Sequence, residues 1–264
     1  MRRPVWLAAF ILLAALPMPS MAVDLAAHRA VYKLTLASSR GAVSDAGGTM
    51  AFELVDACEG WATRQRLRIN TTTDAGQNIE IGSDYATLEA KDGLSLRFNM
   101  RQTTEQAVSS ETEGQASVPA PGAAAGAAGE VRYTSPQAKT LALPPGTIMP
   151  NTHTIAAIDA ARDGKKFIAI PLFDGTSADG AQDTSVAIFS WDKPAPHKFK
   201  VLSTLPSSRM RIAFFDRNKG ATTPDYELGI RYWENGIADE ISMDFGDFVM
   251  RAVLQQLTVL PKAC

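Results

Sequence analysis

Residues 94–101 read Leu-Ser-Leu-Arg-Phe-Asn-Met-Arg, and their pattern indicates the fold class. Every second residue is apolar, and the residues between them are polar or basic. Side chains of a β-strand alternate between the two faces of a sheet, so a period of two indicates a strand with one buried face. An amphipathic helix would instead need apolar residues three or four positions apart. We therefore predict a half-buried β-strand here.

The same alternation recurs along the chain, at 30–36, 50–54, 226–232 and 241–245. Turn signals separate these segments, and Asn235-Gly236 is the clearest of them because Asn-Gly favours a tight hairpin. The pattern predicts a mainly β protein with a long antiparallel sheet. Since about a dozen or more strands rarely stay in one flat sheet, we expect it to curl into a spiral or half-open barrel with a concave apolar face.

Four segments depart from this alternation. The short apolar runs 167–172 and 186–191 predict strands that are buried on both faces. Residues 248–260 fit a buried strand or a short helix, and we favour the strand because of its context.

The fourth segment predicts the one short helix of the fold. Asn151 or Thr152 is expected to cap its N-terminus, and Gly164 to end it. Ile155, Ile158 and Ala161 have the spacing of one apolar stripe, which would pack on the sheet.

The N-terminal residues 1–22 have the pattern of a secretory signal peptide. Arg2 and Arg3 precede an apolar run over 5–16, and Ser20-Met21-Ala22 supplies small residues for cleavage after Ala22. An uncleaved membrane anchor is the alternative, although the run is short for a span of roughly 20 residues. Apart from this leader we predict no membrane span.

Residues 23–264 are predicted to form a single β-spiral domain. Within it, the stretch at about 117–129 is nearly all Ala, Gly and Pro, a composition that cannot build a packed core. We interpret it as a flexible surface excursion of the domain. A boundary between two domains is the alternative interpretation.

The two cysteines, Cys58 and Cys264, both lie in the part that would be exported. An even number of cysteines in an oxidising compartment favours a disulfide, and two cysteines allow one intramolecular pairing. Such a bond would fasten the C-terminus to an early strand. Two free thiols are the alternative. A Cys-x-x-Cys pair is absent, so the sequence does not favour thiol–disulfide catalysis.

The sequence contains few signs of catalysis. The three histidines lack metal-ligand spacing, and no glycine-rich phosphate loop is present, so we expect no metal, no cofactor and no enzyme activity. A net charge of −2 disfavours a nucleic-acid partner. Glu240 and Asp244 share one strand face and are interpreted as solvated, although paired carboxylates for glycoside hydrolysis are the alternative.

The most suggestive polar feature is the series Arg64, Arg66 and Arg68, in which every second residue is arginine. In a strand the three guanidinium groups would share one face. They are candidates for binding an anionic envelope component, such as a lipid phosphate or a peptidoglycan carboxylate. Cross-strand pairing with acidic residues is the structural alternative.

The chain resembles the EipB-like cell-envelope integrity proteins, a periplasmic family of alphaproteobacteria. The segments that carry the resemblance are His28-Arg29-Ala30-Val31-Tyr32, Cys58-Glu59-Gly60-Trp61, Phe173-Asp174-Gly175, Tyr232-Trp233-Glu234-Asn235-Gly236 and Leu260-Pro261-Lys262-Ala263-Cys264. Their order and the position of the two cysteines make the set specific. The Ala/Gly/Pro stretch around Gly122 is not part of the resemblance.

The resemblance implies a broken, spiral-like β-sheet, an internal disulfide and a periplasmic role in envelope integrity. It also implies a fold similar to that of lipoprotein carriers, without assigned catalytic residues. Two classes of function follow as hypotheses. One is a non-enzymatic protein that binds a protein partner, such as a helical-repeat protein, or an envelope component, including a lipid or lipoprotein held in the concave face. The other is a hydrolase of envelope polymers.

Overall fold

The computed structural model describes residues 23–124, 126–217 and 221–264. The signal peptide predicted for residues 1–22 lies outside the described residues. The described part contains fourteen strands, one α-helix and one short 3-10 helix. The fold is therefore mainly β, as the sequence predicts.

The strands follow one another along the chain, with the helix between β8 and β9. Their bounds are β1 His28–Ser39, β2 Val43–Asp56, β3 Gly60–Thr73, β4 Asn78–Ala90, β5 Ser95–Thr104, β6 Ala107–Ser117, β7 Gly129–Ser135, β8 Lys139–Leu143, β9 Phe167–Leu172, β10 Gln182–Ile188, β11 Ser207–Phe215, β12 Tyr226–Trp233, β13 Ala238–Asp244 and β14 Phe248–Val259. The α-helix α1 spans Pro150–Arg162, and the 3-10 helix η1 spans Lys200–Leu202.

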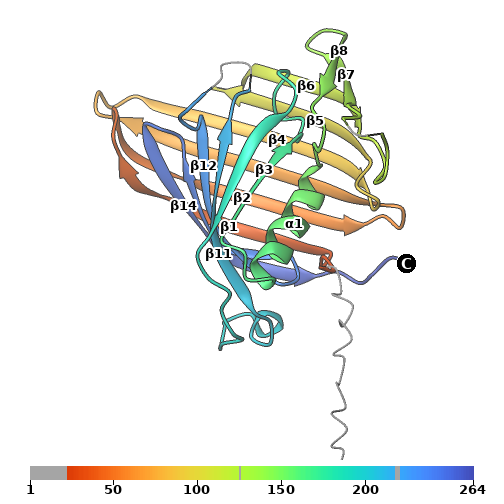
Figure 1. Cartoon of the computed structure of the whole chain (residues 1–264). Helices are drawn as coiled ribbons and strands as arrows, with labels where there is room; N and C mark the ends of the chain where they lie inside the picture. The colour runs from red at the N-terminus through yellow and green to blue at the C-terminus, as the bar shows by residue number, and fades with distance from the viewer. Residues whose placement is uncertain (1–22, 125, 218–220) are drawn as a thin grey trace, which may run out of the picture.

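All fourteen strands belong to one antiparallel sheet with the order β8-β7-β6-β5-β4-β3-β2-β1-β14-β13-β12-β11-β10-β9. The strands β8 and β9 are its two edges, so the sheet is not closed. Ile148, which follows β8, forms a parallel bridge with Leu172 of β9 and brings the two edges near each other. Figure 1 shows the sheet bending back on itself, with β11 to β14 at a steep angle to the long strands. This curled, half-open sheet confirms the predicted architecture.

The alternation in the sequence corresponds to the two faces of the curled sheet. On β5 the side chains of Leu96, Phe98 and Met100 are buried, whereas those of Arg97 and Arg101 are exposed. The apolar side chains face the interior because burial removes their surface from water. The inner face is thus apolar and the outer face polar, as predicted.

A loop between β9 and β10 fills one half of the interior. Phe173 is fully buried and makes edge-to-face contacts with Phe98 and Tyr133, with ring centroids 5.3 and 6.4 Å apart. The loop is also held by hydrogen bonds from Tyr85 to the carbonyl of Asp174 and from Thr112 to that of Gly175. The protein's own side chains therefore pack the inner face of β5 to β8.

The helix α1 packs on the other half of the inner face, where Ala157 and Ala161 share one core cluster with Tyr32 and Met50. Its predicted end at Gly164 is confirmed, since Gly164 has a φ of +76°. Its predicted cap is wrong. The N-cap residue is Met149, which makes no side-chain cap bond, and Asn151 lies inside the first turn.

A carboxylate from the sheet replaces the expected cap. The two oxygens of Glu89 on β4 accept hydrogen bonds from the backbone N–H groups of Asn151 and Thr152, at 2.7 and 2.8 Å. Oε1 also accepts a bond from the Thr152 hydroxyl. These bonds satisfy N–H groups that a helix leaves unpaired at its start, and they fix the helix on the sheet.

The prediction that the runs 167–172 and 186–191 are buried on both faces is wrong. β9 is an edge strand, and Phe167 at its start is 59% exposed. β10 ends at Ile188, before the second run is complete. Apolar content alone does not report the place of a strand in the sheet order.

The C-terminal segment is strand β14, as favoured from the sequence. The Ala/Gly/Pro stretch connects β6 to β7, which pair directly with each other. Both ends of that stretch therefore lie in the same sheet.

Candidate functional site

The inner face of the sheet leaves a cavity of about 280 Å³ in the half that α1 covers. The walls come from β1 to β4 on one side and from β12 and β13 on the other, and the first turn of α1 covers them. The alternation on each strand directs apolar side chains into it, among them Met50, Leu54, Leu228, Ile230, Ile241 and Met243. The curl of the sheet thus brings together residues from both ends of the chain.

The cavity is electrically neutral. No Asp, Glu, Lys or Arg is among the described residues that line it. His28 does line it, but its Nδ1 lies 2.7 Å from the carbonyl of Ala26, and burial lowers the pKa of the imidazole. The ring is therefore uncharged at neutral pH, and the walls disfavour an ionic ligand.

Four of the five tyrosines line this cavity: Tyr32, Tyr85, Tyr226 and Tyr232. The hydroxyl of Tyr32 donates to the carbonyl of Ala238 at 2.8 Å, and that of Tyr85 to the carbonyl of Asp174 at 2.6 Å. Burial raises the pKa of all four phenols, so each of them stays protonated. These rings present apolar surface to the cavity. The hydroxyls of Tyr32 and Tyr85 already donate to backbone carbonyls, so they do not donate to a ligand.

One polar group in the wall has no hydrogen-bond partner. Asn151 is 9% exposed and lines the cavity, and its Nδ2 forms no hydrogen bond with the described residues. Burial raises the pKa of the Glu89 carboxylate, and the amide, as a donor lying near it, weakly lowers that pKa; a second N–H group of the amide remains for another acceptor. A buried donor without a partner is costly, so a ligand with an oxygen acceptor would be favoured here.

The chemistry of the cavity follows from these features. It is suited to an uncharged apolar group, with one hydrogen-bond acceptor placed near Asn151. Its volume lies just below the range of small-molecule sites, which span roughly 300–1,000 Å³. One acyl chain fits this description better than a bulky or charged molecule.

The predicted arginine series lies on the opposite, outer face of β3. Arg66 and Arg68 both pair with Asp84 on the neighbouring strand β4, each at 2.7 Å. Arg64 is exposed and forms no ion pair within the part of the chain that the structure describes. The structure therefore separates these residues from the cavity, and their role in binding stays a prediction.

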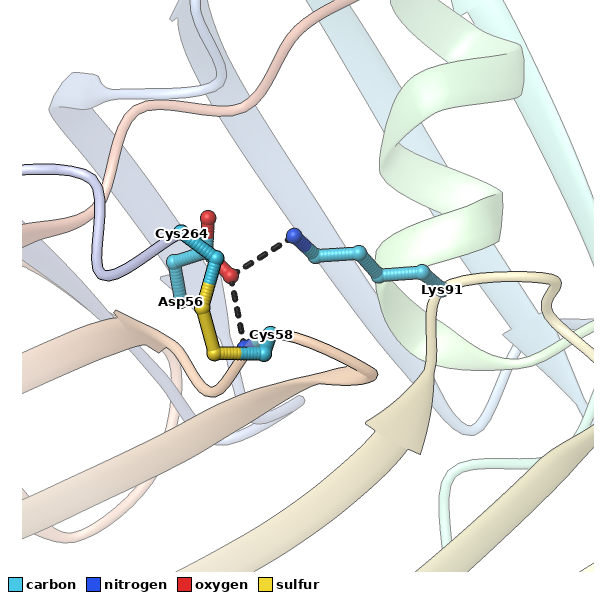
Figure 2. The surroundings of a disulfide bond; sticks show 4 residues. All are labelled: Asp56, Cys58, Lys91 and Cys264. Atoms are coloured by element: carbon cyan, nitrogen blue, oxygen red, sulfur yellow. Dashed lines mark hydrogen bonds and ion pairs between the residues drawn. A yellow bond between two sulfur atoms is a disulfide. The ribbon is translucent and has the colours of Figure 1, made fainter.

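The two predicted disulfide cysteines do meet. Cys58 and Cys264 are bonded, with Cα atoms 5.5 Å apart, and the bond joins the turn after β2 to the last residue of the chain. Figure 2 shows Asp56 beside the bond, where one carboxylate oxygen accepts from the backbone N–H of Cys58 and pairs with Lys91. The C-terminus is thus fastened at the edge of the half that holds the cavity.

The remaining polar candidates have structural partners. His153 contacts the Thr184 hydroxyl, and His197 contacts Asp239. Glu240 pairs with Arg209 and Arg231 on the outer face, and Asp244 pairs with Arg40. Among the described residues, no group of three or more side chains is arranged to hold a metal ion.

Sequence reasoning missed Asn151 as a cavity residue and Glu89 as a helix cap. Asn151 is a residue type that commonly caps a helix, so the sequence predicts a cap and not a residue that lines a cavity. Glu89 lies on the inner face of β4 with Tyr85 and Thr87. The sequence pattern does not predict a strand for this segment, so no signal indicates that the carboxylate is buried.

Comparisons with known proteins agree with this architecture. Residues 19–261 match the model of the family described as EipB-like. The chain is 29% identical over 246 residues to the "Cell envelope integrity protein EipB" of Brucella abortus (strain 2308), covering 90% of this chain and 85% of that protein. It is also similar to a crystal structure of a β-barrel-like protein of a domain of unknown function from Brucella abortus. That match has a TM-score of 0.82 and 29% identity, and it covers 91% of this chain and all of that one.

None of the helices within the described ranges is both long enough and apolar enough to cross a membrane.

Proposed function

The chain belongs to the EipB-like family, and from this premise we propose that it supports cell-envelope integrity by holding an acyl-chain-bearing envelope component in its cavity. The component would be a lipid or a lipoprotein. This function is one of binding and carries no chemical step.

The observation that carries the proposal is the neutral, apolar cavity on the inner face. One half of the interior is packed by Phe173 and its loop, yet the half under α1 keeps an unfilled volume. Burial of apolar ligand surface there would contribute about 25 cal/mol for each Å² removed from water. The unpartnered N–H of Asn151 supplies one polar contact for an ester or amide carbonyl.

The proposed location is the periplasm. A predicted signal peptide would export the chain, and the bond between Cys58 and Cys264 is of the kind that persists in an oxidising compartment. The Brucella relative is named for envelope integrity, which agrees with this location.

A binding experiment with an acyl probe tests the proposal. A fluorescent acyl ester, which carries no charge, is titrated into the protein, and we expect saturable binding with one site per chain. Leu228→Trp places a larger side chain in the cavity, so it should weaken binding of the probe at least tenfold. Leu88→Trp is the matched control, because Leu88 lies on the outer face of the sheet and is 40% exposed.

Two outcomes would overturn the proposal. It is wrong if the wild-type protein binds no acyl probe, or if the two tryptophan variants bind it equally well. Thermal melting of both variants checks that each still folds.

A further inference from the structure

The outer face of the sheet carries a basic band that the proposed function does not use. The band is formed by the outward-facing cations of six neighbouring strands, β14 and β1 to β5. These are Arg29, Lys33, Arg64, Arg66, Arg68, Arg97, Arg101 and Arg251. Four outward-facing carboxylates lie on the same strands: Asp45, Glu53, Glu80 and Asp84. The band thus has a net charge of about +4, whereas residues 23–264 together have 24 cationic and 28 acidic residues, a net −4.

Most of the positive charge is not neutralised within the molecule. Arg29 pairs with Glu53, and Arg66 and Arg68 share Asp84. The other five cations make no ion pair inside the described ranges, and all of them are exposed: Lys33, Arg64, Arg97, Arg101 and Arg251. These charges are therefore available to an external partner.

Acidic strands flank the band on both sides. β6 presents Glu111 and Glu113 opposite Arg101 and Asn99 of β5. On the other side, β13 presents Glu240 and Asp244 next to β14, and both carboxylates are already paired with arginines. The basic band is therefore bordered by the acidic side chains of β6 on one side and by those of β13 on the other.

The band is broad across the strands, and small side chains lie between its cations. Six strands spaced about 4.8 Å apart give it a width of roughly 24 Å. Small residues separate the cations, and around Ala51 and Ala86 they leave an open groove of about 420 Å³ beside Arg64. Leu88 on β4 and Val259 at the end of β14 are the large exposed apolar side chains on these strands in the described part of the chain.

We propose that the basic band docks the protein on the surface of an anionic lipid bilayer. An extended anionic polymer would meet one row of cations, whereas cations on several strands match a two-dimensional array of headgroups. Because apolar anchors are almost absent, the contact would be electrostatic, peripheral and reversible. The band lies on the opposite face from the cavity, so this inference does not depend on the proposed acyl ligand.

Vesicle co-sedimentation tests the inference. Purified protein is mixed with vesicles of phosphatidylcholine alone or with 30% phosphatidylglycerol, at about 50 mM and about 500 mM salt. We expect binding to the anionic vesicles at low salt only. The quadruple variant Lys33→Gln, Arg64→Gln, Arg97→Gln, Arg101→Gln should bind about 600-fold more weakly, since each of the four cations near such a surface contributes about fivefold.

The matched control removes four exposed cations from elsewhere. It is the variant Lys165→Gln, Lys166→Gln, Lys193→Gln, Lys200→Gln, which has the same net charge as the band variant. It should keep wild-type binding, and both variants should keep the wild-type melting temperature. Equal loss in both variants, no binding to anionic vesicles at low salt, or binding to isolated peptidoglycan but not to vesicles would each overturn the inference.

Discussion

Asp56 shows how a single carboxylate fixes the turn that carries Cys58. Its Oδ1 accepts the backbone N–H of Cys58 at 2.9 Å and pairs with Lys91 at 2.7 Å. Cys58 has a φ of +65°, a conformation that few non-glycine residues adopt. Asp56 therefore holds the turn in the geometry that places Cys58 beside Cys264.

The pKa of Asp56 gives a prediction about pH. The hydrogen bond from Lys91 is the main cause that holds the pKa of this carboxyl below its ordinary value of 3.8. A depressed pKa means that Asp56 stabilises the fold above that value, and that this contribution is lost as the pH falls through the lower pKa. Asp56→Asn should lower the melting temperature at pH 7, and the difference from wild type should shrink below about pH 4.

Thermal melts between pH 2.5 and 7 measure this difference, with Asp45→Asn as the control at an exposed site. A gap between wild type and Asp56→Asn that stays constant down to pH 2.5 would contradict the role of the Asp56–Lys91 pair.

At the scale of elements, α1 depends on a cap that comes from the sheet. Glu89 is 1% exposed and accepts bonds from the first turn of the helix. Replacement by Gln turns one acceptor oxygen into an NH2 group that faces a backbone donor. We expect Glu89→Gln to lower the free energy of unfolding by about 1–2 kcal/mol, as loss of a helix cap does.

Chemical denaturation measures that loss, and Glu113→Gln on the outer face of β6 is the matched control. If both variants unfold at the same denaturant concentration as wild type, the cap does not stabilise the helix.

Two neighbouring glycines on β2 give another test of the sheet. A Cβ on Gly48 would lie 2.0 Å from the carbonyl oxygen of Arg68 on β3, whereas one on Gly47 would lie 3.8 Å from its nearest neighbour, the carbonyl oxygen of Leu34. Gly48→Ala must therefore push β2 and β3 apart and should cost about 1–3 kcal/mol or more. Gly47→Ala should change stability by less than about 1 kcal/mol. Equal stability of the two variants would show that the strands are not packed as closely as described.

The elements differ in how well sequence predicts them. The alternation of Leu96, Phe98 and Met100 is a local signal, so β5 and its buried face follow directly from it. The cap of α1 comes from Glu89, 62 residues before Asn151, and no local pattern reports such a partner. The exposure of Phe167 likewise depends on β9 being the edge of the sheet, which is set by the order of all fourteen strands.

At the scale of the whole molecule, the disulfide joins positions 206 residues apart. Closing so long a loop restricts the unfolded chain, and the loop-entropy model assigns this an upper value of about 5 kcal/mol. Cys58→Ser should therefore lower the melting temperature markedly under oxidising conditions. With reductant present, wild type and variant should melt together; equal melting curves in both conditions would contradict a stabilising bond.

The cavity is also a property of the whole molecule. Its walls come from strands near both ends of the chain and from the first turn of α1, so no single sequence motif predicts it. The sequence does predict a concave apolar face, because the alternation is strong and a long sheet must curl. It does not predict that the loop at Phe173 fills one half of the interior and leaves the other half open.

The central claim is that this disulfide-fastened shell holds an acyl-chain-bearing molecule in its neutral cavity. Native mass spectrometry of the protein, released from the cell envelope under non-denaturing conditions, tests this most directly. We expect a mass above that of the processed chain. The added mass should be an acyl species that organic solvent extracts, that is absent from Leu228→Trp and that is present in Leu88→Trp. A bare polypeptide mass in every preparation, in a protein that also takes up no added lipid, would contradict it.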